Sequence, residues 1–109
     1  MNSSSQLGVN NILIIKQNLY LIIMDLTGAY KHYNERLKER FNLEITYYDF
    51  LNKYVFKRTL KKKYIGKYVN YLFGDDMVNV YYITKKYEYP ITVYKLDRFN
   101  KGRILCVFN

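Results

Sequence analysis

The chain has 109 residues, of which 50% are hydrophobic and 25% charged, a balance that is typical of one globular domain and excludes a disordered chain. Its formal net charge of +9 at pH 7 indicates an acidic partner, such as a polymer rich in phosphate. A single cysteine, Cys106, excludes an internal disulfide, and a single histidine, His32, excludes a histidine–cysteine metal site. We therefore expect neither a metal nor another cofactor.

The N-terminal quarter of the chain combines a polar tail with an apolar stretch. Residues 1–8 are expected to be a flexible tail, and the apolar runs NILII and LYLIIM predict a β-hairpin over residues 9–25. This stretch is interrupted by Lys16-Gln17-Asn18 and is too short to span a membrane. It lacks a basic leader and a cleavage site, so we expect an intracellular protein. Met24 is an alternative start that would make residues 1–23 dispensable.

A helix is predicted next. Thr27 is a suitable N-cap, and the following apolar residues recur at helical spacing, namely Tyr30, Tyr33, Leu37 and Phe41. The opposite face carries charges of both signs, which is typical of a solvated surface. Asn42 is expected to end the helix, and Leu43–Ile45 alternates as a short strand would.

Two further helices are predicted before the middle of the chain. Thr46 with Asp49 three residues later approximates a capping box, which opens a short helix through Tyr54. A second cap candidate, Thr59, begins a helix to Phe73, and Gly74 stands in the position where helices stop.

The C-terminal third predicts strands. The segment MVNVYYIT after Asp75-Asp76 alternates and is rich in β-formers, and ITVYKL is a second strand with Pro90 just before it. The residues between them, 85–89, form a charged turn. A last strand, RILCVF, covers residues 103–108. With no repeat or linker in the sequence, residues 9–109 are expected to form a single domain with a core over residues 27–96.

The basic residues concentrate in the middle of the chain. Between Asp49 and Asp75 there is no acidic residue, and the span carries Lys53, Lys57, Arg58, Lys61, Lys62, Lys63 and Lys67. On the helix predicted from Thr59, apolar residues fill one broad arc, and the other arc holds Lys62, Lys63, Gly66, Lys67 and Asn70. Lysines on such a face neutralise phosphates, and an asparagine can pair with adenine in the DNA major groove.

The order of helix, short strand, helix, basic helix, strand, charged turn and strand over residues 27–96 resembles the winged helix-turn-helix family. The resemblance implies an α+β fold, with the N-terminal hairpin as an addition, in which Thr46–Tyr54 and Thr59–Phe73 form the helix-turn-helix. It implies that the recognition helix reads DNA through Lys62, Lys63, Lys67 and Asn70. It also implies that the DNA backbone is contacted by Lys57, Arg58 and the wing residues Lys85 and Lys86. The turn VFKR departs from the family pattern because it lacks glycine.

These features predict a homodimeric protein that binds double-stranded DNA and regulates transcription for a virus or mobile element, in the host cytoplasm or nucleoid. No catalytic activity is expected, because Gly74-Asp75-Asp76 is typical of an ordinary turn and a lone carboxylate pair binds Mg²⁺ poorly.

Three alternatives stay open. Tyr81, Tyr87, Tyr89 and Tyr94, near lysines, could stack the unpaired bases of single-stranded RNA or DNA, although packing in the core and between strands is the commoner role of such residues, because alternate strand positions must face inward. The basic face could dock on an acidic host protein as an inhibitor, or the chain could coat a genome without sequence preference.

Overall fold

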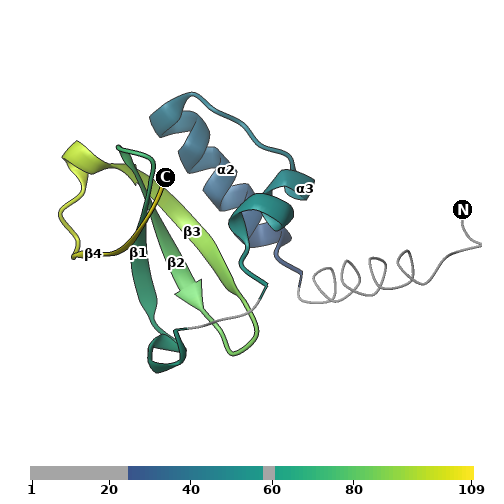
Figure 1. The fold of residues 1–109 in the computed structure, drawn as a ribbon. Helices are drawn as coiled ribbons and strands as arrows, with labels where there is room; N and C mark the ends of the chain where they lie inside the picture. Colours follow the sequence, from purple (N-terminus) through teal and green to yellow (C-terminus); the bar gives the residue numbers. More distant parts are fainter. Residues whose placement is uncertain (1–24, 58–60) are drawn as a thin grey trace, which may run out of the picture.

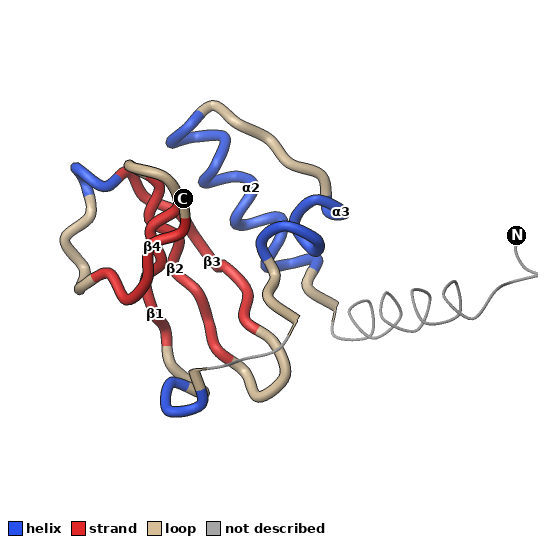
Figure 2. Tube along the Cα trace, viewed as in Figure 1, coloured by secondary structure: helices blue, strands red, loops and turns tan. Residues whose placement is uncertain are grey.

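The computed structural model describes residues 25–57 and 61–109 (Figure 1). The tail over residues 1–8, nearly all of the hairpin predicted over 9–25, and Arg58 lie outside the described residues. The described chain is one α+β unit, in which helices α2 and α3 lie to one side of a four-stranded sheet (Figures 1 and 2).

The first described helix, α2, spans Thr27–Phe41 and confirms the prediction from helical spacing. The N-cap predicted at Thr27 is wrong, because Leu26 occupies the N-cap position and Thr27 is the first helical residue. The Thr27 backbone N–H donates to the Asp25 carboxylate at 3.3 Å. The helix ends at Asn42, whose φ of 55° places it in the left-handed region that asparagine tolerates. The strand predicted over residues 43–45 is wrong, since this segment is an irregular connection held by a 2.9 Å bond from the Ile45 N–H to the Asn34 side chain.

The short helix predicted from Thr46 to Tyr54 is confirmed, and it changes from α-helical to π-helical hydrogen bonding at Phe50. Helix α3, Tyr47–Asp49, begins with the Thr46 hydroxyl accepting from the Asp49 N–H at 3.0 Å, a cap that contributes about 1 kcal/mol. The chain then widens into the π-helical turn η1, Phe50–Tyr54, where the Val55 N–H donates to the Phe50 carbonyl at 3.1 Å. Phe50 is completely buried beneath α2 residues of the core.

The helix predicted over Thr59–Phe73 is wrong. Lys62–Tyr64 form only a single 3₁₀ turn, η2, and Tyr68–Phe73 form strand β1. Between them Ile65 (φ −55°, ψ 129°) and Gly66 (φ 81°) make a type II turn, closed by a 2.9 Å bond from the Lys67 N–H to the Tyr64 carbonyl. A positive φ at Gly66 is incompatible with a continuous helix, so the described residues contain no recognition helix of the predicted kind.

The sheet has the strand order β3-β2-β1-β4 (Figure 2). Strands β2, Met77–Ile83, and β3, Glu88–Lys95, confirm the two strands predicted for this region and pair as an antiparallel hairpin. The turn predicted over residues 85–89 is shorter than expected, because Glu88 and Tyr89 already pair with β2 as part of β3. Strand β1 pairs antiparallel with β2 through the turn at Gly74, so this glycine shapes a hairpin and does not stop a helix. The chain leaves β3 through the short turn η3, Leu96–Arg98, and crosses to β4, Ile104–Phe108, which lies parallel to β1.

One face of the sheet is packed against the helices, and the core lies there in two clusters. Val93 of β3 joins the first, with Leu26, Tyr33, Leu37, Phe50 and Val55. The second cluster consists of Val69, Tyr71, Tyr81 and Ile83. The alternation of buried and more exposed residues along the first part of β1 and along β2 from Asn79 follows from the two-residue period of strands. Val78 breaks the pattern, since it is completely buried although it lies on the opposite face, paired with Leu72 and Tyr94. The other face of β1–β3, called here the open face, carries the remaining side chains of these strands.

Three tyrosine hydroxyls inside this core are hydrogen-bonded. The Tyr33 hydroxyl donates to the side-chain oxygen Oδ1 of Asn79, and the Tyr81 hydroxyl donates to the backbone oxygen of Tyr54 at 2.6 Å. The Tyr71 hydroxyl donates to Glu88 at 2.6 Å. The first two bonds tie the sheet to α2 and η1, and the third joins β1 to β3 within the sheet. Buried hydroxyls are expected to find acceptors in this way.

Candidate nucleic-acid interface

Two segments far apart in the sequence meet at one end of the sheet. The Gly66 N–H donates to the Ile83 carbonyl at 2.8 Å, and the Ile83 N–H donates to the Lys67 carbonyl at 3.1 Å. Phe56 and Glu88 form an isolated antiparallel bridge with two 2.9 Å bonds. These four bonds place the residues around η2 beside the β2–β3 turn, at the lower end of the sheet in Figure 1.

The side chains gathered there are strongly basic. We call this set the basic end; its members are Lys57, Lys61, Lys62, Lys63, Lys67, Lys85 and Lys86. All are exposed except Lys61, which is half-buried. Neither contributing segment, residues 50–74 nor residues 77–87, contains an aspartate or glutamate, and the neighbouring Glu88 is only 3% exposed. The positive potential is therefore offset little by acidic side chains of the same segments.

The turn between β2 and β3 is braced by one threonine. The Thr84 hydroxyl donates to the Tyr87 carbonyl at 2.7 Å and accepts from the Tyr87 N–H at 3.0 Å. The Thr84 N–H also donates to the Tyr87 carbonyl, at 2.9 Å. The two lysines at the tip, Lys85 and Lys86, therefore project from a backbone of fixed shape.

The structure brings together most of the predicted contact residues, though on turns and not on a helix. Lys57, Lys62, Lys63, Lys67, Lys85 and Lys86 all belong to the basic end. Asn70 does not join them, since it lies on the open face of β1 and its amide nitrogen donates to the Arg103 carbonyl at 3.0 Å. In this structure Asn70 therefore holds the crossover loop to the sheet.

Beside the basic end, the open face carries a row of aromatic rings. Tyr68, Tyr82 and Tyr89 occupy paired positions on three adjacent strands, and their ring centroids are 5.1 and 5.9 Å apart. Tyr87 extends the row, 5.6 Å from Tyr89. These four residues are called the tyrosine patch. Tyr68 is 62% exposed, whereas Tyr87 and Tyr89 also pack against the helix-side core and anchor that edge.

The electrostatics of the patch reflect its crowding. Partial burial raises the pKa of Tyr89 above its ordinary value, and the nearby hydroxyls of Tyr87, Tyr82 and Tyr68 raise it further. Tyr89 is therefore harder to ionise than a fully exposed tyrosine.

A groove continues from the patch along the open face. It has a volume of about 270 Å³, and its walls include Tyr68, Asn70, Val80, Thr92, Tyr94 and Lys101. At its far end the Lys101 ammonium lies 5.2 Å and the Arg40 guanidinium 4.5 Å from the centre of the Tyr94 ring. Both distances fit cation–π contacts, so positive charge is also held at this end of the groove.

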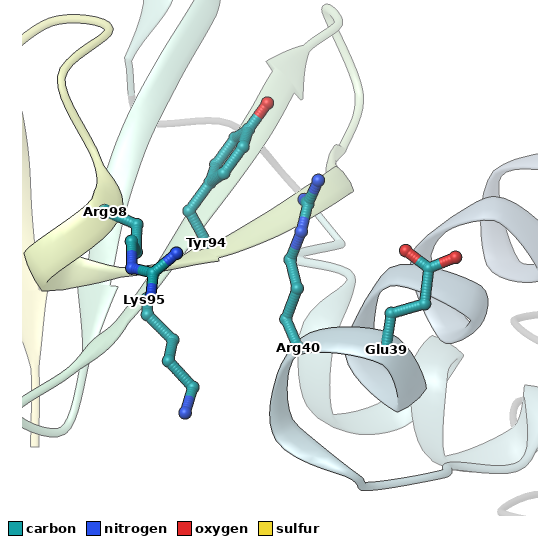
Figure 3. A pocket seen from close by; sticks show the side chains of 5 residues that line it. All are labelled: Glu39, Arg40, Tyr94, Lys95 and Arg98. Carbon is teal, nitrogen blue, oxygen red and sulfur yellow. The ribbon is translucent and has the colours of Figure 1, made fainter.

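A second hollow, of about 380 Å³, adjoins Tyr94 on the edge of the sheet (Figure 3). Arg40 reaches it from α2, Lys95 from β3 and Arg98 from η3, against the single acidic side chain of Glu39. The hollow is therefore basic, like the end of the sheet.

One of the tyrosines predicted to stack bases is placed elsewhere. Tyr81 is completely buried on the helix side, where burial raises its pKa well above the ordinary value and its hydroxyl is bonded to Tyr54. Sequence reasoning missed Tyr68 and Tyr82 instead. The alternation of YVNYLF and MVNVYYI carries their signal, because it places both on the face opposite Tyr71 and Tyr81.

Within residues 25–57 and 61–109, no three histidine, cysteine, aspartate or glutamate side chains lie close enough to hold a metal ion. No helix in this part of the chain has the length and apolarity needed to cross a membrane. No protein-family model, curated protein or solved structure matches the chain.

Proposed function

We propose that this chain is a nucleic-acid-binding protein whose basic end contacts the phosphate backbone. The observation that supports this is the convergence of seven lysines from two separate segments, neither of which carries an acidic residue. Ordinary surfaces mix charges of both signs, as α2 does with its Arg36–Glu39 pair. Each phosphate that a lysine neutralises releases counterions, which favours binding at low salt.

A second candidate is the regulation of transcription at duplex DNA by a homodimer. The β2–β3 hairpin favours it, because its turn carries Lys85 and Lys86 at one end of the sheet, where their side chains can reach into a DNA groove. In this version the hairpin takes over the groove contact that the sequence assigned to a helix. Two copies would place two hairpins on half-sites about one helical turn apart.

The test is fluorescence anisotropy with labelled random-sequence DNA, duplex and single-stranded, over a salt series. We expect the parent protein to bind with a steep log–log salt dependence. Lys62→Gln/Lys63→Gln and Lys85→Gln/Lys86→Gln should each weaken binding and reduce the slope by about 0.7 to 0.9 per lysine. The matched control is Lys31→Gln/Lys38→Gln on α2, which removes the same charge from the helical side.

Two outcomes would contradict the proposal. If both basic-end variants behave like the α2 control, net charge alone drives binding and the basic end is not the site. If the parent binds none of duplex DNA, single-stranded DNA and single-stranded RNA at low salt, the lysines serve another partner, and a nuclease-treated pull-down would then test for an acidic host protein.

A further inference from the structure

We infer that the ligand is single-stranded nucleic acid, with unpaired bases stacked on the tyrosine patch while the basic end holds the adjoining phosphates. This inference rests on the proposed function, because the lysines supply the attraction that brings the strand to the sheet. It adds the class of nucleic acid and the surface that reads its bases.

The first argument is the geometry of the rings. Tyr68, Tyr82 and Tyr89 face the same way from neighbouring strands, which are about 4.8 Å apart in any sheet. Cross-strand packing explains why such rings touch, but it does not explain why Tyr68, at the end of the row, leaves 62% of its surface in water. An exposed ring on a flat sheet offers a π-face to any base, whatever its identity.

The second argument is the position of the lysines relative to the rings. Lys67 directly precedes Tyr68, and its carbonyl is bonded to Ile83, the neighbour of Tyr82. On the adjacent hairpin, Lys85 and Lys86 directly precede Tyr87. Bases on the patch would therefore leave their phosphates next to the basic end. Aromatic platforms beside a basic track are the combination that binds unpaired strands.

The third argument is the continuation of the surface beyond the patch. The groove of about 270 Å³ begins at Tyr68 and ends at Tyr94, where Lys101 and Arg40 hold positive charge. A strand that leaves the patch thus follows a path with a ring and cations at its far end. A duplex cannot use this path, because its bases are stacked on one another and only its phosphates and groove edges are accessible.

The experiment compares two exposed tyrosines. Tyr68→Ala removes a ring of the patch, and Tyr48→Ala removes an equally accessible ring, 70% exposed, from α3 on the helical side. Anisotropy is measured at one low salt concentration with labelled single-stranded DNA, single-stranded RNA of the same sequence, and the DNA duplex. Because both side chains are largely exposed, both variants should fold, and circular dichroism checks this.

We expect the parent to bind a single strand more tightly than the duplex. Tyr68→Ala should lower single-strand affinity about 5- to 150-fold and leave duplex affinity unchanged, while Tyr68→Phe, which keeps the ring, should stay within about threefold of the parent. Tyr48→Ala should match the parent. The inference is supported if either the single-stranded RNA or the single-stranded DNA binds more tightly than the duplex. The single strand with the higher affinity shows whether ribose or deoxyribose is preferred.

The inference is overturned if the parent prefers the duplex, or if Tyr68→Ala and Tyr48→Ala bind a single strand equally well. In either case, a continued loss of binding in Lys62→Gln/Lys63→Gln would leave the basic end as the site of a nucleic-acid-binding protein. Undetectable binding of all three probes would contradict the proposed function as well.

Discussion

The hydroxyl of Tyr71 on β1 donates a 2.6 Å hydrogen bond to a carboxylate oxygen of Glu88 on β3, and both side chains are buried. The backbone of Glu88 meanwhile exchanges two 2.9 Å bonds with Phe56, the residue before Lys57. Glu88 is 3% exposed, so its side chain is fixed by the core while its backbone holds one segment of the basic end. Core stability and the position of the lysines are coupled through this residue.

Tyr71→Phe removes the hydroxyl that bonds Glu88 and keeps the ring. We expect the free energy of unfolding to fall by about 1 to 3 kcal/mol, because a buried carboxyl group loses a donor. Urea denaturation followed by circular dichroism measures the change. Tyr48→Phe is the control, since its ring is 70% exposed and its substitution should cost less than about 0.5 kcal/mol. Equal stability of the two variants would show that the Tyr71–Glu88 bond contributes nothing.

The buried tyrosines predict unfolding at alkaline pH. Burial raises the pKa of Tyr33, Tyr71 and Tyr81 above the ordinary 10.0, and for Tyr71 the bond to Glu88 adds to the effect. Since the unfolded chain releases these protons near pH 10 and the folded chain retains them, stability is fully present below that pH and is lost above it. The loss is about 1.4 kcal/mol per pH unit for each group.

This loss is measurable as a joint titration of tyrosinate absorbance and circular dichroism. We expect a late absorbance step at the pH at which the secondary structure disappears. If all tyrosines ionise together near pH 10 while the structure persists, the core hydroxyls are accessible to water and the prediction is wrong.

Tyr33 and Asn79 form the other buried polar pair of the core. The side-chain oxygen Oδ1 of Asn79 accepts from the Tyr33 hydroxyl, and the Asn79 amide nitrogen is buried with no hydrogen-bond partner among the residues that the structure describes. Tyr33→Phe alone leaves the amide wholly unsatisfied and should cost about 1 to 3 kcal/mol. Tyr33→Phe with Asn79→Leu removes both polar groups, so the double variant should recover most of that loss. A double-mutant cycle by urea denaturation measures the coupling, and simple additivity would contradict it.

Much of this fold is predictable from the local sequence pattern, and the missed strand β1 shows where local pattern is not enough. The spacing of Tyr33 and Leu37 predicts α2, and the alternation of residues 77–83 and 91–95 predicts the β2–β3 hairpin, because one buried face imposes each period. Strand β1 was missed because YVNYLF places apolar residues at both two-residue and helical spacing. Its strand state depends on pairing along both of its edges, antiparallel with the following strand β2 and parallel with the more distant β4, and this pairing is not visible in the local pattern.

In the candidate site, too, some features are predictable from the local sequence and others depend on contacts between distant segments. The density of lysines before Tyr68 is visible in the sequence and indicates a basic surface whatever the secondary structure. Their meeting with Lys85 and Lys86 depends on the bonds between Gly66, Lys67 and Ile83, which no local pattern contains. The face on which each tyrosine lies follows from the strand to which it belongs. Because the sequence predicts a helix where β1 lies, it does not place Tyr68 on a sheet face.

Two glycines should respond to alanine with opposite signs. Gly66 has a φ of 81° in the type II turn before β1, and an added Cβ would meet no atom there, so the cost of Gly66→Ala is backbone strain of about 1 to 2 kcal/mol. Gly28 lies in the first turn of α2 with equally open space, and Gly28→Ala should stabilise by about 0.5 to 1 kcal/mol. Thermal unfolding compares the two, and stabilisation by Gly66→Ala would contradict the assigned turn.

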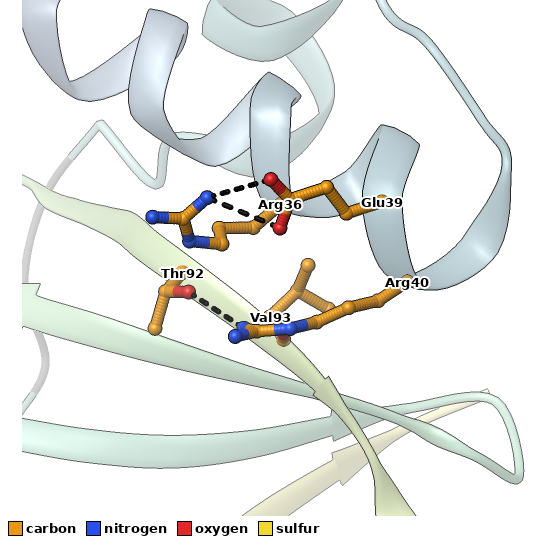
Figure 4. Close-up of polar contacts among 5 residues, drawn as sticks. All are labelled: Arg36, Glu39, Arg40, Thr92 and Val93. Carbon is orange, nitrogen blue, oxygen red and sulfur yellow. Dashed lines mark hydrogen bonds and ion pairs between the residues drawn. The ribbon is translucent and has the colours of Figure 1, made fainter.

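Two arginines one turn apart on α2 should differ in their contribution to stability (Figure 4). The Arg40 Nη1 donates to the Val93 carbonyl at 2.8 Å and to the Thr92 hydroxyl at 3.3 Å, and its guanidinium stacks on Tyr94. It thereby covers the edge of β3, where backbone carbonyls lack a strand partner. Arg36 pairs only with Glu39, an ion pair whose side chains are 31% and 59% exposed.

Arg40→Ala should therefore lower the free energy of unfolding by about 1 to 2 kcal/mol, and Arg36→Ala by less than about 0.5 kcal/mol. Arg40→Lys should recover only part of the loss, because an ammonium cannot both stack on Tyr94 and donate in the plane of a guanidinium. Urea denaturation of the three variants gives these values. Equal costs at the two positions would mean that the edge of β3 is stable without Arg40, and the α2–β3 contact would then rest on apolar packing around Val93 alone.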